Sequence, residues 1–163
     1  MSILHRTLYS AIGNKIARSL VRPFASLIPE SLKFSVVGEI RVRLPEGKSL
    51  SLVANPTSYG SKQLFWHGHE GFEIALFPIF VDLIRDSSVF FDVGANIGYY
   101  SLLAAVYNPD IQIQAFEPLP APNKYVRLNA QSNGFTNIEA NQIALSDQDG
   151  EATFYAARHP KFP

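Results

Sequence analysis

The 163-residue sequence contains no cysteine. This absence excludes a disulfide framework, thiolate zinc sites and cysteine nucleophiles. It does not indicate whether the protein resides in an oxidising or a reducing compartment. The sequence also lacks any apolar run close to the roughly 20 residues that a membrane-spanning helix needs. Its hydrophobic content of 47% and charged content of 17% are ordinary for a folded globular protein and argue against wholesale disorder.

Acidic residues are missing from the first 29 positions, although the net charge of the whole chain is zero. Residues 1–48 contain eight Lys or Arg and three Glu, whereas the remainder contains six basic and eleven acidic residues. Within residues 2–22, leucine and isoleucine recur every four positions, which predicts a basic amphipathic helix. Three interpretations stay open for this helix: packing on the domain or on a partner subunit, peripheral contact with a membrane, or an organelle transit segment.

The segment that follows changes from helical to alternating periodicity. Alternating apolar residues predict a β-hairpin over residues 33–53, with its turn at 45–48, and composition predicts a loop over 55–61. Apolar residues then follow helical spacing from 72 to 84, and Pro78 inside this pattern predicts a kink or a restart of the helix.

His67 and His69 lie between these segments and are the histidines closest to the later motifs. Two histidines spaced i, i+2 with no third ligand nearby do not form a specific metal signature. We therefore expect structural or hydrogen-bonding roles for both, and we predict no metal site.

The stretch 89–101 reads Val-Phe-Phe-Asp-Val-Gly-Ala-Asn-Ile-Gly-Tyr-Tyr-Ser and predicts a buried parallel strand, a glycine-rich turn and a helix. Such a unit lets the backbone approach a nucleotide-like ligand. Further strands are predicted at 111–116 and 137–145, with a helix over 122–130 between them and a returning strand at 151–155. This alternation predicts an α/β, Rossmann-like parallel sheet with helices on its faces.

Two acids stand near the ends of neighbouring predicted strands: Asp92 and, 25 residues later, Glu117. In a doubly wound sheet both strand ends face the same crevice, and a carboxylate after the second strand can accept hydrogen bonds from both ribose hydroxyls. An acid before the turn repels a pyrophosphate and attracts an ammonium group. The turn also lacks the Gly-x-Gly-x-x-Gly pattern of dinucleotide sites, because Asn96 stands at the second glycine's place. This combination favours S-adenosylmethionine over NAD, and an ordinary turn without a ligand is the alternative.

The turn and its neighbours resemble FkbM-type S-adenosylmethionine-dependent methyltransferases, which typically show Asp-Val-Gly-Ala-Asn-x-Gly-x-Tyr-Ser at this position. The resemblance covers about residues 65–155 and implies a Rossmann-like class I methyltransferase sheet. Agreement extends to further short stretches: Gly71-Phe72-Glu73, Ala115-Phe116-Glu117-Pro118, Arg127-Leu128-Asn129, Asn133-Gly134, and Ile143-Ala144-Leu145-Ser146-Asp147 with Gly150.

The resemblance implies S-adenosylmethionine as the cofactor and assigns its contacts. The turn and Asp92 would line the methionine tail, and Glu73 would reach its amino group. Glu117 would hold the ribose, Pro118 would lie against the adenine, and residues 144–146 would border the adenine. No residue is assigned as the catalytic base. The implied cofactor-binding residues are Glu73, Asp92, Gly94, Ala95, Asn96, Gly98, Glu117, Pro118, Ala144, Leu145 and Ser146.

The related proteins also carry a fourth strand with an Asp-x-Glu-Gly-type motif and three more strands, and nothing after Tyr155 matches these. The expectation is a fragment: a sheet that stops after the third strand and a following hairpin strand, inactive alone, with its first strand as an exposed apolar edge. The expected divisions are a helical segment at 1–30, a β-hairpin appendage at 31–64 and a partial cofactor-binding domain at 65–163.

The implied activity is transfer of the sulfonium methyl group to a hydroxyl of a sugar or another small molecule. Alignment of the two reactants supplies most of the rate of such a transfer. The alternatives are half of an NAD-type oxidoreductase and an inactive remnant that interacts through its basic N-terminal helix. The expected partners are a small-molecule or glycan substrate and no nucleic acid, with membrane contact through residues 2–22 left open. The expected location is the cytoplasm, either free or peripheral at a membrane surface.

Overall fold

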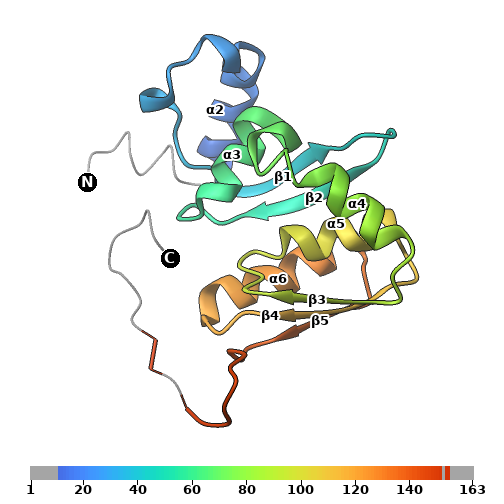
Figure 1. The fold of residues 1–163 in the computed structure, drawn as a ribbon. Helices are drawn as coiled ribbons and strands as arrows, with labels where there is room; N and C mark the ends of the chain where they lie inside the picture. The colour runs from blue at the N-terminus through green and yellow to red at the C-terminus, as the bar shows by residue number, and fades with distance from the viewer. Residues whose placement is uncertain (1–10, 152, 155–163) are drawn as a thin grey trace.

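The computed structural model describes residues 11–151, 153 and 154. Within them, helices and strands alternate from the first parallel strand onward (Figure 1). The elements are α2 (Ala11–Val21), η1 (Arg22–Leu27), η2 (Glu30–Leu32), β1 (Gly38–Arg43), β2 (Ser49–Ala54), α3 (Tyr59–His67), η3 (Gly68–Gly71), α4 (Phe77–Arg85), β3 (Val89–Val93), α5 (Tyr99–Tyr107), β4 (Gln112–Phe116), α6 (Pro120–Asn133) and β5 (Ile138–Asn141), where η marks a 3-10 helix.

Strands β3, β4 and β5 form a parallel sheet in that order, as part of the predicted α/β fold. Helices α5 and α6 lie on one face of this sheet, where Ile113 and Ala115 are buried (Figure 1). Within the described residues, the predicted packing of helices on the sheet holds for this face only, because Phe91 and Val93 on the other face are each 62% exposed. Right-handed crossovers that advance in one direction along a sheet place their helices on the same face, and this sheet never reverses direction.

β3 lies at the edge of the sheet, and Asp92 is its only fully buried side chain. The prediction of a buried first strand is therefore wrong, whereas the expectation of an exposed apolar edge is confirmed. On the open face the rings of Phe91 and Phe116 lie 6.0 Å apart, between centroids. Polar groups also lie on this face: the Gln114 amide donates to Glu139 at 2.7 Å and accepts from Asn141 at 2.8 Å.

The third strand is shorter than predicted. β5 ends at Asn141, and no strand forms in residues 142–151, 153 and 154, so the predicted returning strand is also wrong for its described part. The last rung of the ladder is the bond from the Glu117 amide to the Asn141 carbonyl, at 3.0 Å. Pro118 is the next residue after Glu117 on the β4 side of this pair, and it has no N–H to continue the ladder.

The predicted hairpin is confirmed as the antiparallel pair β1–β2, with Ile40 opposite Leu52 and Arg43 opposite Ser49. Its alternate side chains are buried, as the period of two requires. The hairpin shares one buried apolar cluster with α3, α4, α5 and the start of β4. It therefore lies over α5, on the side away from the parallel sheet (Figure 1).

Two asparagines on α6 bind the outer edge of β2 in place of a third strand. The Ser51 amide donates to Asn133 Oδ1 at 2.7 Å, and Asn133 Nδ2 donates back to the Ser51 carbonyl at 2.7 Å. The Val53 amide donates to Asn129 Oδ1 at 2.6 Å. Asn129 and Asn133 are four residues apart on the helix, a rise of about 6 Å, and Val53 and Ser51 are two residues apart on the strand, a rise of about 6.6 Å. The two spacings match, so each asparagine reaches one strand residue.

Two helical boundaries differ from the sequence-based expectations. The predicted loop over 55–61 is wrong at its end, because α3 begins at Tyr59, with the Ser58 hydroxyl accepting from the Ser61 amide at 3.3 Å as its N-cap. The helix predicted from residue 72 begins only at Phe77. Pro78 stands in the first turn of α4, where its missing N–H costs nothing.

The predicted N-terminal helix is present as α2, and residues 1–10 lie outside the described part of the chain. Asn14 is fully buried and anchors α2, with Nδ2 donating to the Ser35 carbonyl at 3.2 Å and Oδ1 accepting from the Val37 amide at 3.0 Å. Among the described residues, no helix combines the length and the apolar character needed to cross a bilayer.

Candidate functional site

The glycine-rich turn after β3 folds back over the end of β4. The amides of Gly94 and Ala95 both donate to the Phe116 carbonyl, at 2.9 and 3.0 Å. Gly94, Asn96 and Gly98 all have positive φ, at 78°, 51° and 81°. Three left-handed residues in five make a tight turn that holds the start of α5 next to the C-terminal edge of the sheet.

The two glycines of the turn serve different purposes. No atom lies within 4 Å of the place where a side chain on Gly94 would begin, so its backbone faces open space. A Cβ on Gly98 would lie 3.2 Å from Val126 Cγ1 and 3.4 Å from Val126 Cα. Gly94 therefore leaves room for a ligand, whereas Gly98 allows α5 and α6 to pack closely.

Glu117 is buried at the end of β4, and its carboxylate binds the turn. Oε2 accepts from the Asn96 amide at 2.9 Å, and Oε1 accepts from the Leu119 amide at 3.0 Å. Each carboxylate oxygen has a second acceptor site, so both can still accept from a ligand hydroxyl. The structure thus brings Glu117 and the turn together, as the sequence predicts.

Asp92 is buried beside them and binds the first turn of α5. Its Oδ2 accepts from the Ser101 amide at 3.1 Å and from the Ser101 hydroxyl at 2.6 Å. Burial raises the pKa of the Asp92 carboxyl, the two Ser101 hydrogen bonds oppose this shift, and the negative charge of Glu117 adds to it. Asp92 therefore fixes the helix that carries the turn in addition to facing the cavity.

A cavity of about 210 Å³ opens beside the turn. Complete ligand pockets usually measure about 300–1,000 Å³, so this cavity suits an amino-acid-sized group better than a whole nucleoside. It contains five of the predicted contacts, together with residues from α3 and α5. Its lining residues are Ser58, Gly60, Leu64, Phe72, Glu73, Asp92, Gly94, Ala95, Asn96, Ile97, Tyr99 and Tyr100.

Glu73 reaches this cavity from the segment before α4, in a left-handed backbone conformation with φ of 50°. Its carboxylate Oε2 accepts a short hydrogen bond from the Tyr100 hydroxyl. Burial, followed by the bond to Glu73, raises the pKa of Tyr100 well above its usual range. The phenol therefore stays protonated and holds one Glu73 oxygen, which leaves the other oxygen for a ligand.

A second hollow, of about 440 Å³, lies beside Pro118 and contains Ala144 and Ser146 from the predicted adenine contacts. Leu145 is half exposed and does not line it. Glu117 connects the two hollows, because it contacts Asn96 in the first and directly precedes Pro118 in the second. Eight of the predicted contacts therefore line one hollow or the other, whereas Gly98, Glu117 and Leu145 line neither. The first hollow contains Glu73, Asp92, Gly94, Ala95 and Asn96, and the second contains Pro118, Ala144 and Ser146.

Sequence reasoning missed the wall that α3 contributes to the smaller cavity. Ser58, Gly60 and Leu64 belong to segments that the sequence assigned to a loop and to the hairpin appendage. Gly60 leaves room for Phe72, whose ring lies 3.4 Å from the place of the missing Cβ. The only local signal was Ser58, a residue type that favours helix N-caps.

The two histidines have the hydrogen-bonding and packing contacts expected of them. His67 Nε2 lies 2.9 Å from Glu30 Oε1 and 3.1 Å from Lys33 Nζ. The His69 ring packs on Phe77, with centroids 5.4 Å apart. Throughout residues 11–151, 153 and 154, no three His, Asp or Glu side chains gather as a metal site would require.

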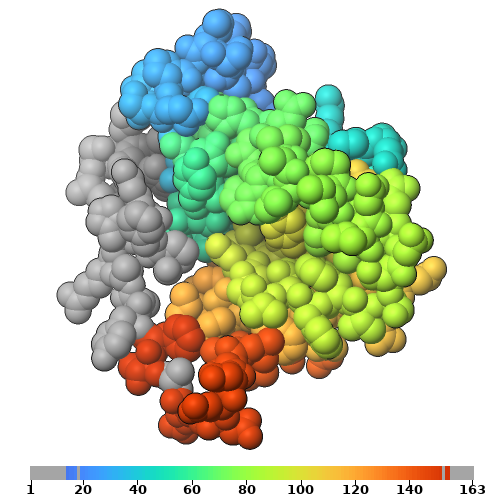
Figure 2. All heavy atoms as spheres, viewed as in Figure 1, coloured from blue at the N-terminus to red at the C-terminus, as the bar shows by residue number. Residues whose placement is uncertain are grey.

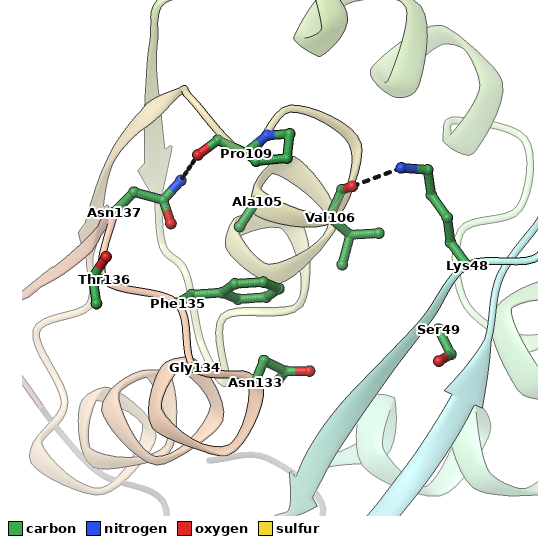
Figure 3. Close-up of a pocket in the computed structure, with 10 residues that line it drawn as sticks. All are labelled: Lys48, Ser49, Ala105, Val106, Pro109, Asn133, Gly134, Phe135, Thr136 and Asn137. Carbon is green, nitrogen blue, oxygen red and sulfur yellow. Dashed lines mark hydrogen bonds between the residues drawn. The ribbon is translucent and has the colours of Figure 1, made fainter.

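A larger hollow, of about 520 Å³, opens at the opposite edge of the sheet (Figure 3). It lies where β4 and β5 begin, between the ends of α5 and α6 and the hairpin turn. Lys48 Nζ donates to the Val106 carbonyl at 2.9 Å, and Asn137 Nδ2 donates to the Pro109 carbonyl at 3.2 Å. These contacts tie loops and a helix C-terminus together, so we do not include this hollow in the candidate site.

The chain is similar to parts of two methyltransferases and one synthetase. It is 40% identical over 74 residues to the 31-O-demethyl-FK506 methyltransferase FkbM of Streptomyces tacrolimicus, covering 44% of this chain. It is 31% identical over 86 residues to Methyltransferase 1 of Beauveria bassiana, covering 52% of this chain. Over 120 residues, or 71% of this chain, it is 36% identical to the AMB antimetabolite synthetase AmbE of Pseudomonas aeruginosa. No protein-family model matches the chain.

The matched regions cover only a small part of each relative. They amount to 28% of the Streptomyces methyltransferase, 32% of the Beauveria methyltransferase and 5% of the Pseudomonas synthetase. The resemblance to FkbM-type methyltransferases is thus confirmed as a partial similarity, in which the chain matches about a third of the length of two methyltransferases.

Proposed function

We propose that the chain provides the S-adenosylmethionine-binding part of a methyltransferase that acts on a hydroxyl of a sugar or another small molecule. The observation that carries this proposal is a pair of hollows, one lined by Asn96, which bonds to Glu117, and one lined by Pro118, which follows Glu117 in sequence. The smaller one contains two carboxylates, Glu73 and Asp92, and the open backbone of Gly94. The partial similarity to two methyltransferases supports the same assignment.

The residues of the smaller cavity fit the methionine tail. Two acids beside one cavity favour a cationic ammonium group there. Tyr100 orients the Glu73 carboxylate, and Ser101 orients that of Asp92. The volume of about 210 Å³ suits a group the size of an amino acid.

The remaining part of the cofactor would extend past Glu117 toward the second hollow. The two Glu117 oxygens are already directed by backbone amides and each keeps one acceptor site for a ribose hydroxyl. The hollow beside Pro118 and Ala144 would then take the adenine. When bound, S-adenosylmethionine supplies an electrophilic methyl group on a sulfonium, and the chain's residues orient that group for attack.

The same geometry disfavours NAD. A pyrophosphate at the start of α5 would lie near the carboxylates of Asp92 and Glu73, which repel it. The turn also presents Asn96, with φ of 51°, where a dinucleotide site uses a glycine to admit the pyrophosphate. The name of the Streptomyces relative, a 31-O-demethyl-FK506 methyltransferase, describes an oxygen acceptor and supports the hydroxyl as the target.

Calorimetric titration of the full chain with S-adenosylmethionine and with NAD tests this proposal. We expect binding of S-adenosylmethionine only, weakened at least about tenfold by Glu117→Gln, because an amide cannot replace both carboxylate acceptors. Glu139→Gln is the matched control, since Glu139 lies on the open face of the sheet. Binding of NAD alone, or equal loss in both variants, would contradict the cofactor assignment.

The acceptor is tested separately, with methyl-labelled cofactor and a panel of hydroxyl-bearing and amine-bearing sugars. Label on an oxygen supports the proposed substrate class. Transfer to amines alone would refute it while leaving the cofactor assignment intact.

A further inference from the structure

The N-terminal helical segment exposes a stripe of large apolar side chains. Ile16, Leu20, Phe24, Leu27 and Leu32 are between 57% and 77% exposed. Ile16 and Leu20 are one helical turn apart on α2, and the stripe continues through η1. In the space-filling view this segment protrudes from the body of the molecule (Figure 2).

The stripe is not needed to attach the segment to the rest of the protein. Asn14 is fully buried on α2 and bonds to residues 35 and 37. Val21, Ala25 and Ile28 pack against the main apolar core. Because Ile16 and Leu20 lie about 160° and 120° around the helix from Asn14, α2 has one apolar face on the protein and another facing outward.

The charged residues of α2 and η1 are all basic, and Glu30 in η2 is the first acid along the chain. The basic residues are Lys15, Arg18 and Arg22. The Lys15 side chain is exposed. Arg22 lies at a hollow whose charged lining residues are Lys15, Arg22, Arg41 and one acid, Glu39. Its guanidinium carbon lies 5.6 Å from the centroid of the Phe65 ring.

We propose that this stripe docks on an anionic lipid bilayer, with its leucines and Phe24 in the interface and its cations at the headgroups. Amphipathic helices with this distribution of residues bind in the plane of a bilayer. A protruding convex ridge fits a deformable bilayer, whereas a second copy of the same basic ridge would meet like charge. The absence of acids over 29 positions specifies an anionic surface rather than a neutral one.

Sedimentation of the full chain with vesicles tests the proposal. Vesicles of phosphatidylcholine with about one third phosphatidylserine should bind the chain, and pure phosphatidylcholine should bind it at least about tenfold less. Raising the salt from 0.1 to 0.5 M should release it, because ions screen the attraction of the headgroups. Ile16→Gln with Leu20→Gln should weaken binding at least about tenfold, since both side chains lose their apolar contact with the bilayer.

The matched control is Ile79→Gln with Leu83→Gln. These residues are also an isoleucine and a leucine four positions apart, and both are exposed on α4. The control pair should bind vesicles like the unmodified chain. Equal loss in both pairs, or no binding of the unmodified chain, would refute the proposal. A dimer that the Ile16 and Leu20 changes dissociate would also refute it, because a second copy would then cover the stripe.

Discussion

Asn129→Ala is expected to lower the free energy of unfolding by about 2–6 kcal/mol. Asn129 is fully buried on α6, where Oδ1 accepts from the Val53 amide at 2.6 Å and Nδ2 donates to the Ile97 carbonyl at 2.7 Å. Alanine leaves both backbone groups without their partner. Each unsatisfied buried group costs about 1–3 kcal/mol, which sets the expected range.

Urea unfolding followed by far-ultraviolet circular dichroism measures this loss. With a slope of about 2 kcal/mol per molar urea, the midpoint should fall by about 1–3 M. Gln131→Ala is the control, because Gln131 is exposed on the same helix and such surface changes usually stay within about 0.5 kcal/mol.

If Asn129→Ala fails to fold, the same measurement can be made on Asn133→Ala. Asn133 makes the equivalent pair of bonds to Ser51 but is only half buried, so water can replace part of them and the loss should be smaller. An Asn129→Ala midpoint equal to that of Gln131→Ala would refute the reasoning. It would show that the hairpin does not depend on the α6 amides.

Two further predictions concern buried groups near the candidate site. Tyr99→Phe should leave the urea midpoint unchanged or raise it, because the Tyr99 hydroxyl is buried with no hydrogen-bond partner among the described residues, and a clear fall would contradict this. Burial raises the pKa of the Asp92 carboxyl in the folded protein. Protonation of Asp92 therefore contributes stability, and this contribution is fully present below the ordinary aspartate pKa of about 4. It is lost as the pH rises through the folded-state pKa. Asp92→Asn can still accept hydrogen bonds from Ser101 but does not titrate. Its free energy of unfolding, measured by urea titration, should therefore rise relative to that of the unmodified chain as the pH increases from about 4 to about 7. A difference between the two proteins that stays constant over this range would contradict the prediction.

Local patterns were sufficient to predict β1, β2, β3, β4 and the turn after β3, since each depends on residues adjacent in sequence. The turn is an example: Gly94 and Gly98 have the positive φ that glycine permits, and both stand where the sequence places them. The arrangement of helices on one face was not predictable in the same way. It follows from the order of strands across the sheet, which periodicity does not contain.

The cavity shows the same division between local and distant information. Glu117 and Asn96 could be paired from the sequence because strand ends of a parallel sheet meet at one edge. The α3 wall could not be predicted in this way, because only the tertiary fold brings Ser58 and Gly60 to the same cavity as the turn. The Arg-Leu-Asn stretch was recognised as a motif, yet the partner of Asn129 on β2 lies 76 residues away.

Asn129 also explains why the hairpin and the candidate site belong to one cooperative structure. One side chain bonds both to β2, through Val53, and to the glycine-rich turn, through Ile97. The hairpin supports α3, whose Gly60 and Leu64 form the cavity wall opposite the turn. We expect a ligand that fills the cavity to contact both walls, and its binding energy to stabilise the hairpin and the turn together. The hairpin is therefore part of what shapes the site, although none of its own residues lines the smaller cavity.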